Sequence, residues 1–229
     1  MIDVAGNCER IREQVAQAAR RGGRDPQAVR IIAASKTKPV DLIEQAIGAG
    51  MTDIGENYVQ EAADKIARIS APVTWHMIGH LQRNKAGRAV EIFDVIHTVD
   101  SVALADALAR HGERCGHVVR VLLEVNLGAE TTKHGVGPGE VERLVASLAD
   151  RRWLLLDGLM SIPPPGKSPE DSCPYFRRLR ELRDRLRAAA APNCPLRELS
   201  MGMTDDFQVA IEEGATMVRI GRAIFGERR

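Results

Sequence analysis

Lys36 is the residue whose surroundings most favour covalent chemistry. Side chains alternate along a strand, so Ile32, Ala34 and Lys36 share one side of the apolar run that they end. Partial desolvation and a nearby cation lower the pKa of a lysine amine, and the uncharged amine condenses with aldehydes. The simpler interpretation is a lysine that extends into water at a strand end. Lys38, in the loop before Pro39, is the competing amine.

A second set of residues, near the carboxyl end, could bind an anion. In one strand phase Arg219 points inward together with Gly221, and a buried guanidinium needs an acceptor or a ligand. The following glycine-containing segment offers the backbone amides of Gly221 and Arg222 at a possible short helix, where an anion is favoured. An ion pair between Arg219 and Glu124 is the purely structural alternative.

Further polar residues stand at other predicted strand ends. Ser200 and Thr204 flank a glycine and could bind phosphate oxygens, although Thr204 could equally cap the next helix. Asn57 follows another strand. His76 is interpreted as a buried core histidine without a catalytic role.

The elements that must position these residues form a repeating pattern of apolar runs and helical segments. Such alternation is typical of a parallel sheet, and eight runs favour a closed (β/α)₈ TIM-type barrel, in the α/β class, whose active face lies at the carboxyl ends of the strands. The eight runs are Val29 to Lys36, Thr52 to Gly55, Thr74 to Gly79, Asp94 to Val99, Val118 to Asn126, Leu154 to Ser161, Arg197 to Met201 and Met217 to Gly221.

Helices are expected between the strands, with an additional one before the first strand. That N-terminal helix, near Asn7 to Arg21, could cover the barrel floor. Proline and glycine residues mark where the other helices begin and end. We expect one helix that begins at Pro39 and ends at Gly48 to Gly50, and another that is capped by Asp100 or Ser101 and ends before Gly112. A third has an apolar stripe formed by Val141, Leu144, Val145 and Leu148. A proline-rich excursion from Pro163 to Pro174 then precedes a charged helix over Tyr175 to Ala191.

Composition limits the classes of partner. The 229 residues suit a single domain over 1–229, and a formal net charge of +1 gives no general attraction to nucleic acid or anionic lipid. The four cysteines and six histidines show no metal-ligand spacing, so we expect reduced thiols and no metal. No signal peptide or apolar run of membrane-spanning length is evident, which predicts a cytoplasmic protein.

Six segments, in order, resemble the pyridoxal phosphate homeostasis protein family, from Ile31 to the carboxyl end. They are AASKTKP, IGENYVQE, WHMIGHLQRNK, GLMSIP, LSMGMTDD and MVRIGRAIFG. The resemblance implies a barrel similar to the N-terminal domain of alanine racemase, with pyridoxal 5′-phosphate joined to Lys36 as an imine. Arg83 departs from the family pattern, in which serine is more usual, and places an extra cation near the rim.

The resemblance also implies the roles of the remaining site residues. Phosphate contacts fall to Ser200, Thr204 and the Gly221 to Arg222 backbone, with Arg219 near the pyridine nitrogen and Asn57 beside the cofactor. A permanent cation facing that nitrogen disfavours its protonation and makes the ring a poorer electron sink.

These implications favour a cofactor-binding protein that stores or delivers pyridoxal phosphate over an enzyme. A racemase needs a second acid/base group from a separate carboxyl-terminal domain, and the sequence stops at Arg229 after the eighth unit. We expect no catalytic turnover, pyridoxal-phosphate-dependent apo-enzymes as possible partners, and a monomer or weak dimer. The alternative is a Schiff-base enzyme, aldolase- or racemase-like, acting on a phosphorylated carbonyl compound or an amino acid; a pure interaction module is the third class.

Overall fold

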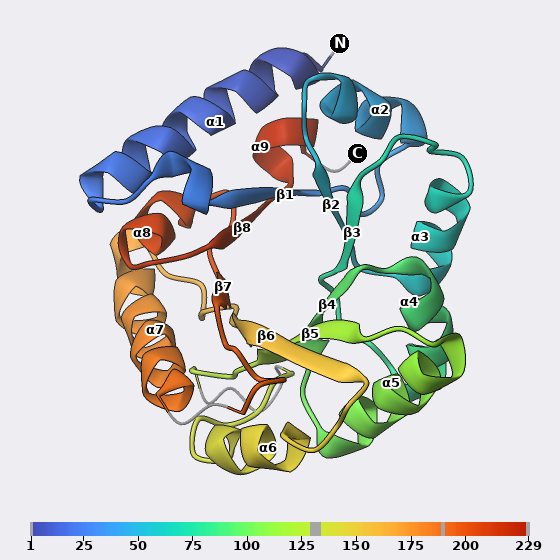
Figure 1. Ribbon diagram of the computed structural model, residues 1–229. Helices are drawn as coiled ribbons and strands as arrows, with labels where there is room; N and C mark the ends of the chain where they lie inside the picture. The colour runs from blue at the N-terminus through green and yellow to red at the C-terminus, as the bar shows by residue number, and fades with distance from the viewer. Residues whose placement is uncertain (1, 129–133, 189–190, 228–229) are drawn as a thin grey trace.

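Eight parallel strands form a closed barrel in which each strand pairs with its neighbours in the chain (Figure 1). The computed structural model describes residues 2–128, 134–188 and 191–227. Every strand lies within two residues of its predicted run, so the predicted (β/α)₈ barrel is confirmed. The strands are β1 (Arg30–Ala34), β2 (Asp53–Glu56), β3 (Thr74–Met77), β4 (Val95–Val99), β5 (Val119–Glu124), β6 (Leu154–Met160), β7 (Glu198–Ser200) and β8 (Met217–Ile220).

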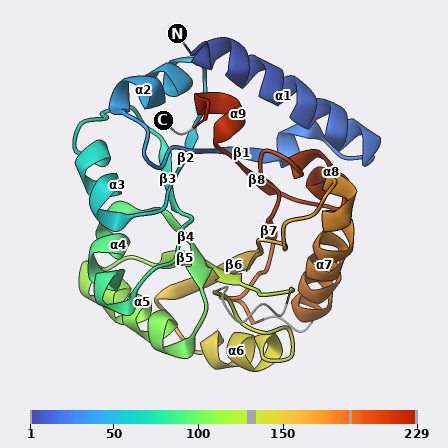
Figure 2. The ribbon, with the colours of Figure 1, turned by 180° about the vertical axis from the view of Figure 1, so that it is seen from behind.

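A ring of helices surrounds the barrel (Figures 1 and 2). Seven of them connect consecutive strands, and short 3₁₀ turns precede some elements. None of the helices in the described ranges is long and apolar enough to cross a membrane. The connecting helices are α2 (Val40–Gly48), α3 (Val59–Ile66), α4 (Ala86–Ile92), α5 (Val102–Cys115), α6 (Val141–Leu148), α7 (Cys173–Arg187) and α8 (Phe207–Glu212), and the 3₁₀ turns are η1 (Pro26–Ala28), η2 (Arg83–Lys85) and η3 (Pro169–Ser172).

The N-terminal helix α1 (Val4–Arg21) occupies the place of an eighth helix in this ring. The helix after β8, α9 (Arg222–Phe225), is a single turn, and α1 packs against α8, α9 and α2 instead (Figure 1). Its buried stripe, which includes Ile11 and Val15, joins the main apolar core. The expectation that this helix covers the barrel floor is therefore wrong, because α1 lies in the outer ring and packs against its neighbouring helices.

Side chains divide into an outer and an inner layer as the predicted strand phases require. Ile31 and Val218 belong to the large cluster between strands and helices, whereas Ile32 and Met217 pack inside the barrel. The inner apolar clusters are small, and polar side chains fill the space between them. The barrel interior therefore positions polar groups across its width. The inner apolar residues are Ile32, Ile78 and Met217 in one cluster and Val95, Leu122 and Met160 in the other.

Some predicted helix boundaries need correction. Helix α5 begins after the Ser101 cap as expected but runs past Gly112 to end at Gly116, which has a φ of 71°. Helix α7 begins at Cys173, because proline is tolerated in a first helical turn; part of its predicted end, residues 189–190, lies outside the described residues. Thr204 does not cap α8, whose N-cap residue is Asp206.

Replacing Gly158 by alanine is expected to destabilise the fold. Gly158 pairs with Glu198 between β6 and β7, and a Cβ atom at this position would lie 2.0 Å from the Glu198 carbonyl oxygen. Two strand backbones would have to separate, which we expect to lower the free energy of unfolding by about 3 kcal/mol. Urea denaturation measures this loss. Gly139→Ala is the control, since nothing lies near its added Cβ, and equal stability of the two variants would contradict the prediction.

Candidate functional site

A cavity of about 440 Å³ opens at the carboxyl ends of the strands and gathers most of the predicted site residues. It is bounded by the ends of β1, β2, β3, β6, β7 and β8, where a TIM-type barrel carries its active face. Six of the seven predicted residues line this cavity, and Ser200 is the exception. The six are Lys36, Asn57, Thr204, Arg219, Gly221 and Arg222.

Lys36 lies in a tight turn two residues after β1 ends. Its side chain is half-buried and lines the cavity, in the strand phase predicted for it. The next residue, Thr37, has a φ of 63°, which a β-branched residue rarely adopts. Backbone strain of this kind persists only where surrounding contacts hold it in place, so the turn that presents Lys36 is actively constrained.

A buried network around Lys65 supplies that constraint on both sides of Lys36. The Lys65 amine donates to the Ser35 carbonyl at 2.8 Å, to Glu56 Oε1 at 2.6 Å and to Glu61 Oε1 at 2.7 Å. Ser35 Oγ donates to Glu56 Oε1 at 2.5 Å, and the Thr37 amide donates to Glu61 Oε1 at 2.6 Å. The residues before and after Lys36 are therefore both tied to one ion-pair cluster, which we call the Lys65 clamp (Ser35, Glu56, Glu61 and Lys65).

The competing amine, Lys38, is hydrogen-bonded to the carboxyl-terminal segment of the chain. Its Nζ donates to the carbonyls of Phe225, Gly226 and Glu227, at 3.2, 2.9 and 2.9 Å. These carbonyls follow the single turn of α9, so Lys38 fastens the carboxyl-terminal segment to the cavity wall. An ammonium that donates three hydrogen bonds is poorly suited to act as a nucleophile, because the nucleophile must be an uncharged amine.

The loops after β7 and β8 form the adjoining wall of the cavity, since β8 pairs directly with β1. Gly221 permits close packing of this wall on β1, since an added Cβ would lie 3.1 Å from the Ala34 carbonyl oxygen. The Arg222 side chain pairs with Asp205 and Glu227 at the surface. Its charge is thus largely compensated, and the backbone of residues 221–222 and Thr204 remain the candidate anion contacts on this wall.

Arg219 reaches the cavity from inside the barrel. Its guanidinium donates to Ser200 Oγ at 2.6 Å and to the Ser161 carbonyl at 3.0 Å, and the side chain is 4% exposed. Among the described residues Arg219 forms no ion pair with Glu124, which was the purely structural alternative, and Glu124 acts on Arg219 only through Coulombic attraction. Burial lowers the pKa of Arg219 to about 10, with Glu124 and Asp206 opposing the shift, so it is still a cation at neutral pH.

Ser200 lies beneath the cavity rather than in its wall. It is fully buried, and its hydroxyl contacts both Arg219 and His97. The structure thus does not bring its side chain to the cavity with the other six residues. Arg83, the departure from the family pattern, is exposed in η2 and lies outside the cavity lining.

Glu124 should make folding stability depend on pH. Burial raises the pKa of Glu124 from about 4.5 to about 7, against the attraction of Arg219. Between these values the folded state retains a proton that the unfolded chain has released, so the free energy of unfolding falls as pH rises. Glu124→Gln removes this dependence. We expect the cofactor-free variant to match the wild type at pH 4 and to be more stable by about 3 kcal/mol at pH 8, measured by urea denaturation; parallel pH profiles would contradict this.

Two features of the site escaped sequence reasoning. Lys65 shares a helix face with Val59 and Ala62, all three of which are buried, and a lysine in an apolar stripe was the available signal. Glu56 is the last residue of β2, and a single carboxylate at a strand end is a weak signal. The interior contacts of His76 and His97 left no sequence signal, because their partners come from distant strands.

Similarity to known proteins extends over almost the whole chain. Residues 7–229 match the family model of the alanine racemase N-terminal domain. The pyridoxal phosphate homeostasis protein of Aquifex aeolicus is 42% identical over 226 residues, which cover 97% of this chain and 98% of that protein.

Solved structures show the same similarity. PipY of Synechococcus elongatus with PLP bound has a TM-score of 0.83 and 38% identity, over 94% of this chain and 100% of that one. The alanine racemase of Clostridium difficile in complex with cycloserine has a TM-score of 0.74 at 13% identity, over 95% of this chain and 59% of the racemase; that likeness is one of fold.

Proposed function

The chain belongs to the family of pyridoxal phosphate homeostasis proteins, which share the alanine racemase N-terminal domain, and we propose that it binds pyridoxal 5′-phosphate at Lys36. Its role is the homeostasis of this vitamin B6 cofactor within the cell, through storage or delivery. The observation that carries the proposal is one cavity lined both by a constrained, half-buried lysine after β1 and by the candidate anion contacts after β7 and β8.

The residues present fit this cofactor. An aldehyde needs an amine, which Lys36 supplies, and a phosphate needs backbone donors and a hydroxyl, which residues 221–222 and Thr204 supply. Asn57 Oδ1 is buried and has no hydrogen-bond partner among the described residues, so a ligand that donates to it would satisfy an otherwise costly group. Ser200 contributes through Arg219 in this proposal rather than by touching phosphate.

Arg219 sets the chemical character of the site. The bound cofactor supplies a reactive aldehyde and an aromatic ring that can withdraw electrons when its nitrogen is protonated. A guanidinium beside that nitrogen opposes protonation, because two positive charges would then be adjacent. The protein therefore holds the cofactor without promoting carbanion chemistry.

We propose further that the chain works as one barrel domain in the cytoplasm, as a monomer or weak dimer, without catalytic turnover. Apo-enzymes that require pyridoxal phosphate are the proposed recipients. The aldolase- or racemase-like alternative is not favoured, since the relatives bear the name of a homeostasis protein.

Hydride reduction of the purified protein tests the proposal. Protein incubated with pyridoxal phosphate should show a visible absorbance band that disappears on treatment with borohydride. Peptide mass mapping should then place one pyridoxyl phosphate group on Lys36. A colourless protein after incubation, or a group mapped to another lysine, would overturn the assignment; turnover of phosphorylated carbonyl compounds by colourless protein would favour the aldolase-like alternative.

A further inference from the structure

A continuous chain of hydrogen bonds crosses the barrel interior and ends on Arg219. Arg219 Nη1 lies 2.6 Å from Ser200 Oγ, and Ser200 Oγ lies 2.9 Å from His97 Nδ1. His97 Nε2 lies 2.9 Å from His76 Nδ1, and His76 Nε2 lies 3.0 Å from Asp53 Oδ1. The three inner members, Ser200, His97 and His76, are fully buried, Arg219 is 4% exposed and Asp53 is 7% exposed. We refer to Asp53, His76, His97 and Ser200 as the interior relay.

The chemistry of its two ends fixes the direction of every bond in the relay. A guanidinium can only donate, so Ser200 Oγ accepts from Arg219, and its own hydrogen goes to His97 Nδ1 when that ring is neutral and donates from Nε2 toward the Asp53 end. The proton of a neutral His97 ring then lies on Nε2 and points to His76 Nδ1. By the same reasoning His76 carries its proton on Nε2 and donates to Asp53, which is a pure acceptor when ionised.

The electrostatics of the interior agree with this assignment. Burial holds the pKa of His97 well below its usual range, and burial also lowers that of His76 despite the attraction of Asp53. Burial opposes ionisation of Asp53, but hydrogen bonds from His76 and Thr52 outweigh it and lower the pKa of Asp53. Both rings are thus neutral between a carboxylate and a guanidinium. The other charged groups acting on these rings are Arg30, Asp94 and Arg120.

We propose that the interior relay positions Arg219 for the cofactor and sets its hydrogen-bond geometry from the far side of the barrel. Asp53 stands at the start of β2 and lines a cavity at the opposite end of the barrel, with Arg12 and Arg30. The Asp53 carboxylate polarises the hydrogen bonds of His76, His97 and Ser200 in turn. Hydrogen bonds that form a chain in a low-dielectric interior strengthen one another, so the effect reaches Arg219. This inference deepens the proposed function and rests on it for the role of Arg219.

Histidine-ring nitrogen NMR of the cofactor-free protein tests the relay independently of cofactor binding. We expect two histidines to show the neutral ring with its proton on Nε2, unchanged between about pH 5.5 and 8.5, where exposed histidines titrate. Assignment uses His76→Gln and His97→Asn. A proton on Nδ1 of either ring, or titration of either ring in this range, would overturn the proposed direction.

Absorbance of the cofactor-loaded protein tests the positioning role. His97→Asn keeps an acceptor for Ser200 but removes the donor to His76, and therefore cuts the relay while leaving Asp53 charged. We expect it to shift the pH titration of the visible band by about half a unit or more and to weaken cofactor binding about tenfold. Asp53→Asn should shift the same titration. Thr98→Val, on the same strand but outside the relay, is the control.

The outcomes separate the possible failures. A shift in Asp53→Asn without one in His97→Asn would indicate direct attraction through space and would overturn the relay. Unchanged titrations in both variants, with wild-type unfolding curves, would overturn it as well. Absence of any coloured wild-type protein would instead refute the proposed function, while the NMR result would still decide the direction of the bonds.

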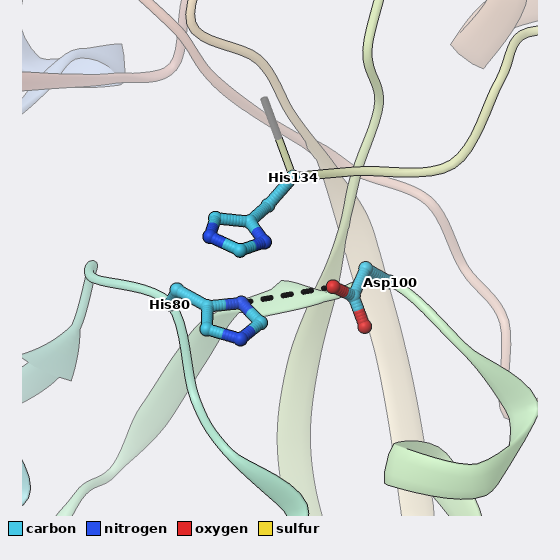
Figure 3. Close-up of side chains that lie close together, drawn as sticks. All are labelled: His80, Asp100 and His134. Carbon is cyan, nitrogen blue, oxygen red and sulfur yellow. Dashed lines mark ion pairs between the residues drawn. The ribbon is translucent and has the colours of Figure 1, made fainter. Parts of the chain in front are cut away.

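A separate cluster at the rim brings together two imidazoles and a carboxylate from three different loops (Figure 3). His80 follows β3, Asp100 follows β4 and His134 lies in the loop after β5. One ligand atom from each lies within 4.8 Å of the others, and His80 Nδ1 is 3.7 Å from Asp100 Oδ2. The histidine rings stack with centroids 3.6 Å apart.

We infer that this rim cluster (His80, Asp100 and His134) binds a divalent transition-metal ion such as Zn²⁺. Zinc prefers four ligands of the imidazole and carboxylate kind, and three protein ligands leave one position open. Ligands at about 2.1 Å from a tetrahedral ion lie roughly 3.4 Å apart, so the distances between the ligand atoms, which are up to 4.8 Å, must shorten by up to about 1.4 Å. The parallel rings do not aim their nitrogens at one point, and the exposed His134 ring must turn to do so.

Titration with Zn²⁺, and with Co²⁺ as a coloured substitute, tests this site on protein free of cofactor and of any histidine tag. We expect one ion per chain, with Co²⁺ bands that lack thiolate character. His80→Ala, Asp100→Ala and His134→Ala should each weaken binding at least tenfold, on the scale of a lost ligand contact. The control is His117→Ala, at an exposed histidine. No binding, binding indifferent to the three variants, or a thiolate spectrum would overturn the inference.

Discussion

Lys36→Ala should abolish the covalent attachment of pyridoxal phosphate and with it the visible absorbance of the loaded protein. Lys36 supplies the amine of the cavity, and the anion contacts after β7 and β8 remain when it is truncated. We therefore expect no borohydride-stable group after incubation, together with residual non-covalent binding that is weaker by about 100-fold or more. Absorbance spectra, mass analysis and equilibrium dialysis measure these three effects.

Lys38→Ala is the matched control for this prediction. It removes an amine from the same turn and the same cavity, but one that donates to the carbonyls of Phe225, Gly226 and Glu227. This variant should keep the visible band and the adduct at Lys36, and it should loosen the carboxyl-terminal segment. Retention of the adduct in Lys36→Ala, or its loss in Lys38→Ala with a normal unfolding curve, would contradict the assignment.

Lys65→Met should cause a large loss of stability, about 3–5 kcal/mol in the free energy of unfolding. Lys65 is 6% exposed, and Glu56 is fully buried with its second carboxylate oxygen unpartnered among the described residues. Removing the ammonium leaves Glu56 without its compensating charge in the interior, a situation of known cost. Urea denaturation of the cofactor-free protein measures the loss, and Lys167→Met, at an exposed lysine, should cost little.

A double variant separates the charge effect from lost packing. Replacing both Lys65 and Glu56 by methionine removes the pair without leaving a buried charge, so much of the lost stability should return. The turn at Lys36 should nonetheless remain poorly held in the double variant, because Ser35 loses its bonds to both replaced residues. Glu61, which accepts from the Thr37 amide, loses its Lys65 partner as well. A double variant as unstable as Lys65→Met alone would show that the clamp acts through packing.

The same residues show how far sequence reasoning extends. The alternation of side chains along β1 predicts Ile32 inside the barrel and Ile31 outside it, as the structure has them. The alternation along β8 likewise predicts Met217 inside and Val218 outside. Such predictions succeed because alternation along a strand is a local property of the backbone. The N-terminal helix shows the limit, since its position depended on the shortness of α9, more than 200 residues later in the chain.

The sequence alone predicts the closed barrel and the end of the barrel that carries the site. It also predicts that Lys36 and the last two strand ends line that site. These depend on periodicity, strand ends and glycine positions, which neighbouring residues encode. Only the tertiary structure decided that Lys38 is engaged elsewhere, that Ser200 turns toward Arg219, and that the Lys65 clamp, the interior relay and the rim cluster exist. Each of these depends on distances between side chains from separate strands and loops, and barrel closure sets those distances.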